Sequence, residues 1–336
     1  MNTETKLLSD TAHQVFGALT DGADAWQQIE VMGLTRIGIP EHLGGSGGTT
    51  DQARIVLRAA AYHAARIPLA ETLWLAAPIL ADARMPIPDG PLTIANATGG
   101  DLRVHASRDG SSLRLDGTLN RVPWARRATR IVIATDERVC LIEPNTCTIT
   151  EGENLAGEPR DDIRLDGVTI DTDDVGTLPY RLNLRSRGAL ARSIQISGAA
   201  QRALDHSVEY AGQRTQFGRP IAQFQAVQQH LAQIAGEATI LDVSVASATR
   251  KAAERPDGSP AIAAARINAC RGAGVVAELA HQIHGAIGTT HEHQLRLATT
   301  RLWSWREEFG NETEWSRTLG NTATGADDPW HFITAL

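Results

Sequence analysis

Two stretches of the chain gather the side chains best suited to holding a ligand. They are YAGQRTQFGRPIAQFQAVQQHLAQI (residues 210–234) and AHQIHGAIGTTHEHQLRLATTRLW (residues 280–303). In the first stretch the planar guanidinium of Arg214 offers paired donors to a phosphate, and Phe217 offers an apolar wall. In the second, Gly285 lets the backbone approach a ligand where a Cβ would obstruct it. Plainer interpretations stay open: a surface cation, a core anchor and the glycine-rich end of a helix.

Acidic and histidine side chains near the second stretch raise two further hypotheses. Glu307 and Glu308 could provide a general base, but adjacent carboxylates of this kind are more often solvated surface groups. A zinc site could be built from His281, His284, His291, His293 and Glu292. Because His284 and its neighbours fall inside the second stretch, which is suited to holding a larger ligand, we favour no metal site.

The elements that must position these residues follow from hydrophobic periodicity. Residues 1–88 place apolar side chains at spacings of three and four and predict an N-terminal helical domain. Residues 89–178 contain short alternating runs such as RIVIATD and predict a middle antiparallel β domain of roughly six strands. Residues 179–336 return to helical spacing and predict a C-terminal four-helix bundle. The expected fold class is α+β, mostly α.

Composition excludes several classes of protein. The chain has 336 residues with 32 Lys+Arg against 39 Asp+Glu, a formal net charge of −7 that argues against nucleic acid or a membrane surface as partner. No apolar run approaches the length of a bilayer span, and the N-terminus is acidic where a secretory signal would be basic. Three cysteines build neither a disulfide framework nor a zinc knuckle, so a reducing cytoplasm is expected.

Together with the order of helices, sheet and helices, the two motifs resemble those of the flavin-dependent acyl-CoA dehydrogenases. In that family the first motif is R-x-x-F-G-x-P-I-x-x-x-Q, and here it is intact from Arg214 to Gln225. The second is Q-x-x-G-G-x-G, and here it runs from Gln282 to Gly288 with Ala286 at one glycine position. Two long motifs in the right order are far more specific than one glycine-rich loop.

The resemblance implies a tetramer that binds FAD. In the family these positions hold the adenine and pyrophosphate half of an FAD that belongs mainly to a neighbouring subunit. The residues that the resemblance assigns to cofactor binding are Arg214, Phe217, Phe224, Gln225, Gln282, His284, Gly285 and Ala286.

The chain departs from the family where the flavin ring would bind. Active members carry a T-E-P-x-A-G-S-D-like segment, and the corresponding ANATGGDL (residues 95–102) keeps only its small residues. The W-I-T segment that follows is replaced by RVPWARRATR (residues 121–130), with Trp124 as a remnant. We therefore expect an eroded flavin-ring site.

The chain also departs from the family at the catalytic base, the carboxylate that removes the α-proton of the acyl-CoA. One family position for this glutamate aligns with Phe309, next to a retained Gly310, and the other falls near Gly188. Neither residue is acidic. Glu307 and Glu308 lie close in sequence, but a shift of one residue on a helix turns a side chain by about 100°.

One subset of the family combines such losses with intact motifs. Heteromeric actinobacterial acyl-CoA dehydrogenases pair a catalytic subunit with a related subunit whose own site has decayed, and the ending RLWSWREEFG (residues 301–310) looks like the second type. The resemblance implies an α2β2 heterotetramer in lipid β-oxidation that desaturates an acyl-CoA at its α,β bond. Bulky steroid side-chain esters and electron-transfer flavoprotein are the implied substrate and electron acceptor.

Two alternatives remain open. A self-sufficient homomeric dehydrogenase or oxidase would use Glu307 or Glu308 as base and would bind FAD by itself. A purely structural partner subunit would bind no cofactor, and its Arg214, Gln225 and Gln282 would be replaceable.

Overall fold

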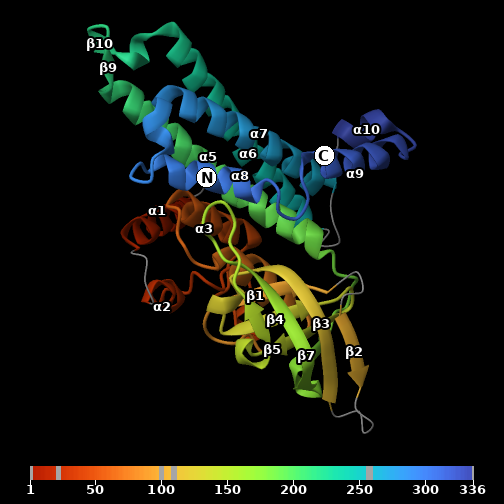
Figure 1. Cartoon of the computed structure of the whole chain (residues 1–336). Coiled ribbons are helices and arrows are strands. Elements are labelled where there is room, and N and C mark those ends of the chain that lie inside the picture. The colour runs from red at the N-terminus through yellow and green to blue at the C-terminus, as the bar shows by residue number, and fades with distance from the viewer. Residues whose placement is uncertain (1–2, 20–23, 98–101, 107–111, 255–259, 335–336) are drawn as a thin grey trace. The chain divides into compact units, whose positions relative to one another are not determined.

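The computed structural model describes residues 3–19, 24–97, 102–106, 112–254 and 260–334. The chain forms two compact units (Figure 1). The first, the bundle unit, contains Met1–Gly17, Arg54–Ala65 and Gly188–Leu336, and the second, the sheet unit, contains Ala18–Ala53 and Arg66–Arg187.

The bundle unit is helical because Ala-rich stretches with apolar spacings of three and four run through it. Three long helices dominate: α5 (Leu184–Gln213), α6 (Gln225–Glu254) and α7 (Pro260–His284). Shorter ones follow: α8 (Leu295–Trp305), α9 (Glu312–Thr324) and α10 (Pro329–Thr334). Most of α1 (Thr3–Ala18) and α3 (Thr50–Tyr62) belongs to the same unit. The short helices η6 (Ile221–Gln223) and η7 (Gly285–Thr289) lie next to the two motifs.

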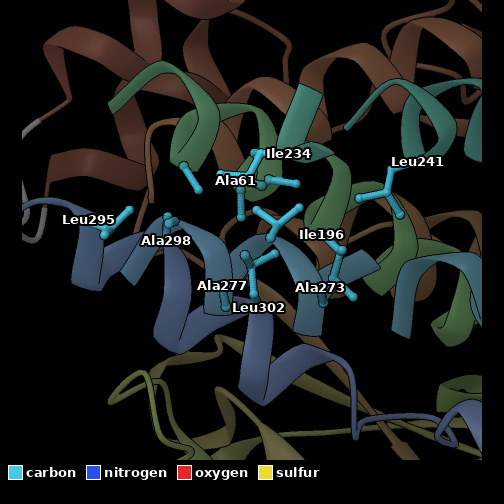
Figure 2. Close-up of a cluster of buried hydrophobic side chains, with 14 of the residues drawn as sticks. Ala61, Ile196, Ile234, Leu241, Ala273, Ala277, Leu295, Ala298 and Leu302 are labelled. Carbon is cyan, nitrogen blue, oxygen red and sulfur yellow. The ribbon is translucent and has the colours of Figure 1, made fainter. Parts of the chain in front are cut away.

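The core of the bundle unit alternates small and large side chains. Figure 2 shows Ile196, Ile234 and Leu302 converging on Ala61 and Ala277, from helices far apart in sequence. Small alanines let the helix axes approach one another, and the larger aliphatic groups fill the remaining space. The ends of α5 and α7 are therefore held rigidly at one end of the bundle.

The sheet unit contains two four-stranded sheets. One has the order β1-β4-β5-β8, formed by Leu92–Asn96, Arg130–Ala134, Arg138–Ile142 and Val175–Thr177. The other has the order β2-β3-β7-β6, formed by Leu102–Ala106, Ser112–Pro123, Arg160–Asp171 and Thr148–Thr150. Alternate side chains of both sheets meet in one apolar core that includes Leu115, Ile131 and Ile163. The remaining helices of this unit are α2 (Asp24–Val31), η1 (Glu41–Leu43), the π-helix η2 (Ala70–Ala76), α4 (Ala77–Asp82), η3 (Ala125–Arg127), η4 (Pro144–Thr146) and η5 (Thr172–Asp174).

One strand pair differs from the predicted antiparallel sheet. β1 pairs with β4 in parallel, Leu92 opposite Arg130, whereas the other strand pairs are antiparallel in the part of the chain that the structure describes. A parallel pair needs a crossover connection, usually a long helix, and the described residues between β1 and β4 form no helix longer than the three-residue η3. The chain instead supplies the crossover with β2 and β3, two strands of the other sheet.

The predicted fold class, with helices before and after a central β region, is confirmed. The domain limits 1–88, 89–178 and 179–336 stay a prediction, because the compact units divide the N-terminal helices between them. Among the described residues no helix has the length and apolar character needed to cross a membrane.

Candidate cofactor-binding site

A tight hairpin between α5 and α6 carries the first motif (Figure 1). β9 (Thr215–Gln216) pairs antiparallel with β10 (Arg219–Pro220), and the two turn residues Phe217 and Gly218 have φ of 51° and 80°. A two-residue turn with both residues at positive φ follows the twist of its strands but strains any side chain other than glycine. Phe217 accepts this strain while being 91% exposed. Backbone strain of this kind is typical of functional sites.

Beside the hairpin lies the first hollow, with a volume of about 320 Å³. It is bounded by the end of α5, the hairpin, the start of α6 and the end of α7. Its walls are apolar and aromatic with a few polar groups, as in most ligand sites. The lining residues are Tyr210, Arg214, Gln216, Phe217, Ile221, Phe224, Val227, Gln282, Ile283, His284 and Gly285.

Arg214 is the one charged side chain in this lining, because the neighbouring histidine is neutral. His284 is 4% exposed, and burial lowers the pKa of its imidazole below the usual value of 6.5. Its Nδ1 donates to the Ala280 carbonyl at 2.8 Å, and its ring stacks on Tyr210 with the centroids 4.4 Å apart. His284 therefore contributes a neutral aromatic surface, and the net charge of the lining is positive.

A second hollow of about 480 Å³ shares Gln282 and Gly285 with the first. Its other lining residues are Glu278, His281, Ala286, Thr289 and Trp303. Gly285 separates the two hollows and has φ of 64°, and a Cβ built on it would meet no other atom within 4 Å. Because Gly285 has no side chain, the surface of the chain is open at this point, and a ligand could approach its backbone closely.

Seven of the eight predicted cofactor-binding residues line one of the two hollows. Arg214, Phe217, Phe224, Gln282, His284 and Gly285 line the first, and Ala286 lines the second. Gln225 lines neither hollow; it begins α6 with its side chain exposed.

Sequence reasoning missed Tyr210, Gln216 and Trp303 as lining residues. Tyr210 lies one helical turn before Arg214, whose N–H donates to the Tyr210 carbonyl at 2.8 Å. The sequence could have indicated both of the first two residues. Helical spacing places Tyr210 on the same face as Arg214, and strand alternation places Gln216 on that face as well. Trp303 had no local signal, because it reaches the second hollow by stacking on His281 with the centroids 5.3 Å apart.

The two positions that the family resemblance assigns to a base meet in the bundle unit. A Cβ built on Gly188 would lie 2.3 Å from Cδ1 of Phe309, so the Phe309 ring fills the space that a side chain at 188 would use. Phe309 itself has φ of 56°, and its carbonyl accepts a hydrogen bond from Trp315 Nε1 at 2.9 Å. An aromatic ring thus occupies this region in place of a carboxylate.

Glu308 and Glu307 differ sharply in environment. Oε2 of Glu308 accepts a hydrogen bond from Arg192 Nε at 2.7 Å, with side-chain exposures of 13% and 1%. Glu307 pairs with Arg306 at 3.0 Å and is 56% exposed. The expectation of two solvated carboxylates is therefore wrong for Glu308, because Arg192, distant in sequence, draws it inward.

The segments aligned with the flavin-ring contacts lie in the sheet unit. Of ANATGGDL, Ala95 and Asn96 end β1, while residues 98–101 are outside the described residues. Trp124 is 4% exposed, with φ of 58°, and its N–H donates to the Pro159 carbonyl at 3.1 Å. Arg126, two residues later, forms an ion pair with the fully buried Asp161. This segment is fastened into the core of its unit.

Among the described residues, no group of three or more His, Cys, Asp and Glu side chains is arranged to hold a metal ion. His281 instead hydrogen-bonds Thr299 Oγ1 through its Nε2 at 3.0 Å. Burial also lowers the pKa of this imidazole.

Comparison with known proteins finds a family model and several relatives that this chain resembles. Residues 184–307 match the model of the acyl-CoA dehydrogenase C-terminal domain. The chain is 27% identical over 312 residues to the acyl-CoA dehydrogenase FadE34 of Mycobacterium tuberculosis. The match covers 90% of this chain and 43% of that relative, so the chain spans less than half of its length.

Two solved structures share the fold over nearly the whole chain. A chain of the ChsE4-ChsE5 complex from Mycobacterium tuberculosis has a TM-score of 0.85 at 21% identity, covering 97% of this chain and 98% of that one. A chain of the Tcur3481-Tcur3483 steroid ACAD has a TM-score of 0.78 at 21% identity, covering 96% and 98%.

Proposed function

Because the chain belongs to the acyl-CoA dehydrogenase family, whose members are FAD-dependent oxidoreductases, we propose that it is the non-catalytic subunit of a heteromeric acyl-CoA dehydrogenase. In this proposal its bundle unit clasps the adenine and pyrophosphate half of an FAD held mainly by a catalytic partner. The partner supplies the flavin-ring contacts and the base.

The residues around the first hollow fit the dinucleotide half of FAD. Arg214 would bind phosphate oxygens with its paired donors, and the lining presents no carboxylate to repel them. Phe217, Phe224 and Tyr210 give aromatic surface for an adenosine, and Gln282 gives an amide at the boundary between the hollows. Gly285 leaves room for the ligand backbone. FAD, when bound, supplies a hydride acceptor.

The observation that carries the non-catalytic role is the Phe309 ring over Gly188. A base must reach the α-proton of the acyl group through its own carboxylate, and geometry precedes pKa in judging a candidate. Here an aromatic ring fills the region where both family positions meet. The surrounding contacts fasten this arrangement, because the ion pair between Arg192 and Glu308 lies against it, with the guanidinium carbon 5.7 Å from the Phe309 centroid.

Glu307 and Glu308 are poor replacements for the base. The ion pair with Arg192 engages Oε2 of Glu308 at 2.7 Å and holds this side chain inward at 13% exposure. Glu307 is mostly in solvent and pairs with its neighbour Arg306. Neither carboxylate lines a hollow of the bundle unit among those described above.

The proposed partner and substrate rest on the relatives. Both fold neighbours come from two-component complexes, and one is named as a steroid enzyme. We therefore assign an α2β2 assembly with a related full-length catalytic subunit, and a bulky acyl-CoA such as a steroid side-chain ester as substrate. Electron-transfer flavoprotein is the proposed acceptor. The cytoplasm is the proposed location, since all three cysteines are free and two of them are buried.

The test is a visible absorption spectrum of this chain purified alone and after co-expression with its catalytic partner. Only the complex should be yellow, and Arg214→Ala should lower its flavin content at unchanged subunit ratio. Arg250→Ala, at an exposed position in the far part of α6, is the matched control.

Two outcomes would contradict the proposal. Stoichiometric FAD in the lone chain, with dye reduction by acyl-CoA that Glu307→Gln or Glu308→Gln abolishes, would establish a self-sufficient dehydrogenase. Unchanged flavin content and activity after replacing Arg214, Gln225 and Gln282 together would establish a structural subunit.

A further inference from the structure

A second arginine of the hairpin, Arg219, has no role in the proposal above. The hairpin register pairs Gln216 with Arg219 and Thr215 with Pro220, and the next pair outward joins Arg214 to Ile221 through a 2.8 Å hydrogen bond. Side chains alternate between the two faces of a strand, and paired residues share a face. Arg219 therefore lies on the same face as Arg214, Gln216 and Ile221, and these three line the first hollow.

The Arg219 guanidinium lies over an aromatic ring. Its central carbon lies 4.3 Å from the centroid of Phe224, a lining residue of the hollow, and Phe217 meets the same ring edge-on at 6.1 Å. A guanidinium stacked on a ring keeps its N–H donors in the plane, directed outward from the stack. Arg219 is thus held in place with its donors still free.

Neither hairpin arginine has an ion-pair or hydrogen-bond partner for its guanidinium among the described residues. Two buried arginines of the bundle unit are engaged instead, Arg192 with Glu308 and Arg266 with three backbone carbonyls. In a chain with a net charge of −7, two unpaired arginines on one face of a strained hairpin indicate an anion that comes from outside the chain.

We propose that Arg219 is a second phosphate-binding residue, which with Arg214 holds the diphosphate bridge of the dinucleotide from one hairpin face. This inference rests on the proposed function and adds a residue to its site. Two guanidiniums match two adjacent phosphates, each of which carries a negative charge. Phe224 then has two roles in the site: its ring lines the hollow, and it also positions the guanidinium of Arg219.

The experiment titrates FAD into the flavin-depleted complex and follows flavin fluorescence at low and at high salt. Arg219→Gln should weaken FAD binding by about ten- to a hundredfold, the usual worth of a hydrogen bond to a charged group. It should also flatten the dependence of affinity on salt, because fewer charges are left to screen. Arg219→Lys keeps the charge but loses the stack, so it should lie between Arg219→Gln and the unchanged complex.

The control and the contrary outcomes separate this inference from the proposed function. Arg250→Gln removes an exposed arginine of the same unit and should leave both affinity and salt dependence unchanged. If Arg214→Ala weakens FAD binding and neither Arg219 variant does, the proposed function stands and the role of Arg219 is wrong. If neither the Arg214 variant nor the Arg219 variants change FAD affinity, the proposed function and the role of Arg219 are both wrong. Arg219→Lys gives the answer even where Arg219→Gln disturbs the hairpin.

Discussion

The clasp region around the hairpin and the base region around Phe309 belong to one unit and differ in how their polar groups are satisfied. At the hairpin, the guanidiniums of Arg214 and Arg219 form no ion pair or hydrogen bond with the described residues, and Phe217 is 91% exposed. At the base region, Arg192 and Glu308 pair with each other, and the Phe309 ring packs on Gly188. Within the part of the chain that the structure describes, the hairpin arginines keep donors that a ligand could use, whereas the polar groups beside Phe309 engage one another. Polar side chains without partners at the hairpin and paired polar side chains beside Phe309 favour the hairpin as the ligand-binding region of the two.

The largest effect is expected from breaking the base region. Arg192→Ala would remove the guanidinium that pairs with the 13% exposed side chain of Glu308, so the free energy of unfolding should fall by about 3–5 kcal/mol. Urea denaturation of the isolated chain measures this. Arg306→Ala, which removes the exposed pair with Glu307, should cost less than about 1 kcal/mol. Equal costs for the two variants would mean that the base region is not held together internally.

A smaller effect is expected at Gly188. Gly188→Ala would drive a methyl group into the Phe309 ring and should lower the free energy of unfolding by about 1–3 kcal/mol. In a Phe309→Ala background, Gly188→Ala should lower the free energy of unfolding much less. The difference between the two values measures the interaction between positions 188 and 309. Gly236→Ala, in α6 with open space around its Cβ, should instead stabilise the chain by about 0.5–1 kcal/mol. A cost at Gly188 that persists without the ring would refute the contact.

The smallest change in stability, with the opposite sign, is expected at the turn of the hairpin. Phe217→Gly relieves a side chain at positive φ and should stabilise the lone chain by up to about 1 kcal/mol. The same change should reduce FAD retention by the complex, because it removes a wall of the hollow. Phe217→Asn should have the same two effects, because an asparagine tolerates positive φ and lacks the aromatic ring. Loss of stability in both variants would mean that the turn carries no strain.

Periodicity and motifs predicted most of the fold and much of the candidate site. Apolar spacing located the long helices, and alternating runs predicted roughly six of the eight strands that the described residues form between 92 and 177. Seven of the eight residues implied by the motifs line the hollows, since both motifs lie on elements whose local geometry is set by nearby residues. Gln225 shows the limit of this approach, because its spacing within the motif does not reveal that its side chain is exposed.

The features that escaped prediction depend on contacts between distant residues. The parallel pairing of β1 with β4 arises because the intervening chain visits the other sheet. The burial of Glu308, in the turn after α8, depends on Arg192, which lies in α5. The stack of Arg219 on Phe224 depends on hairpin register. Spacing along the chain does not determine any of these three.

The contact between Phe309 and Gly188 also bears on how such a protein can change over generations. An acidic side chain at 188 meets the ring at 309, and shrinking the ring first leaves a void beside a glycine. Each single step toward a working base therefore passes through a less stable chain. Under the proposed non-catalytic role, a return to an acidic side chain at 188 would therefore require substitutions at both positions, which makes the loss of the base hard to reverse.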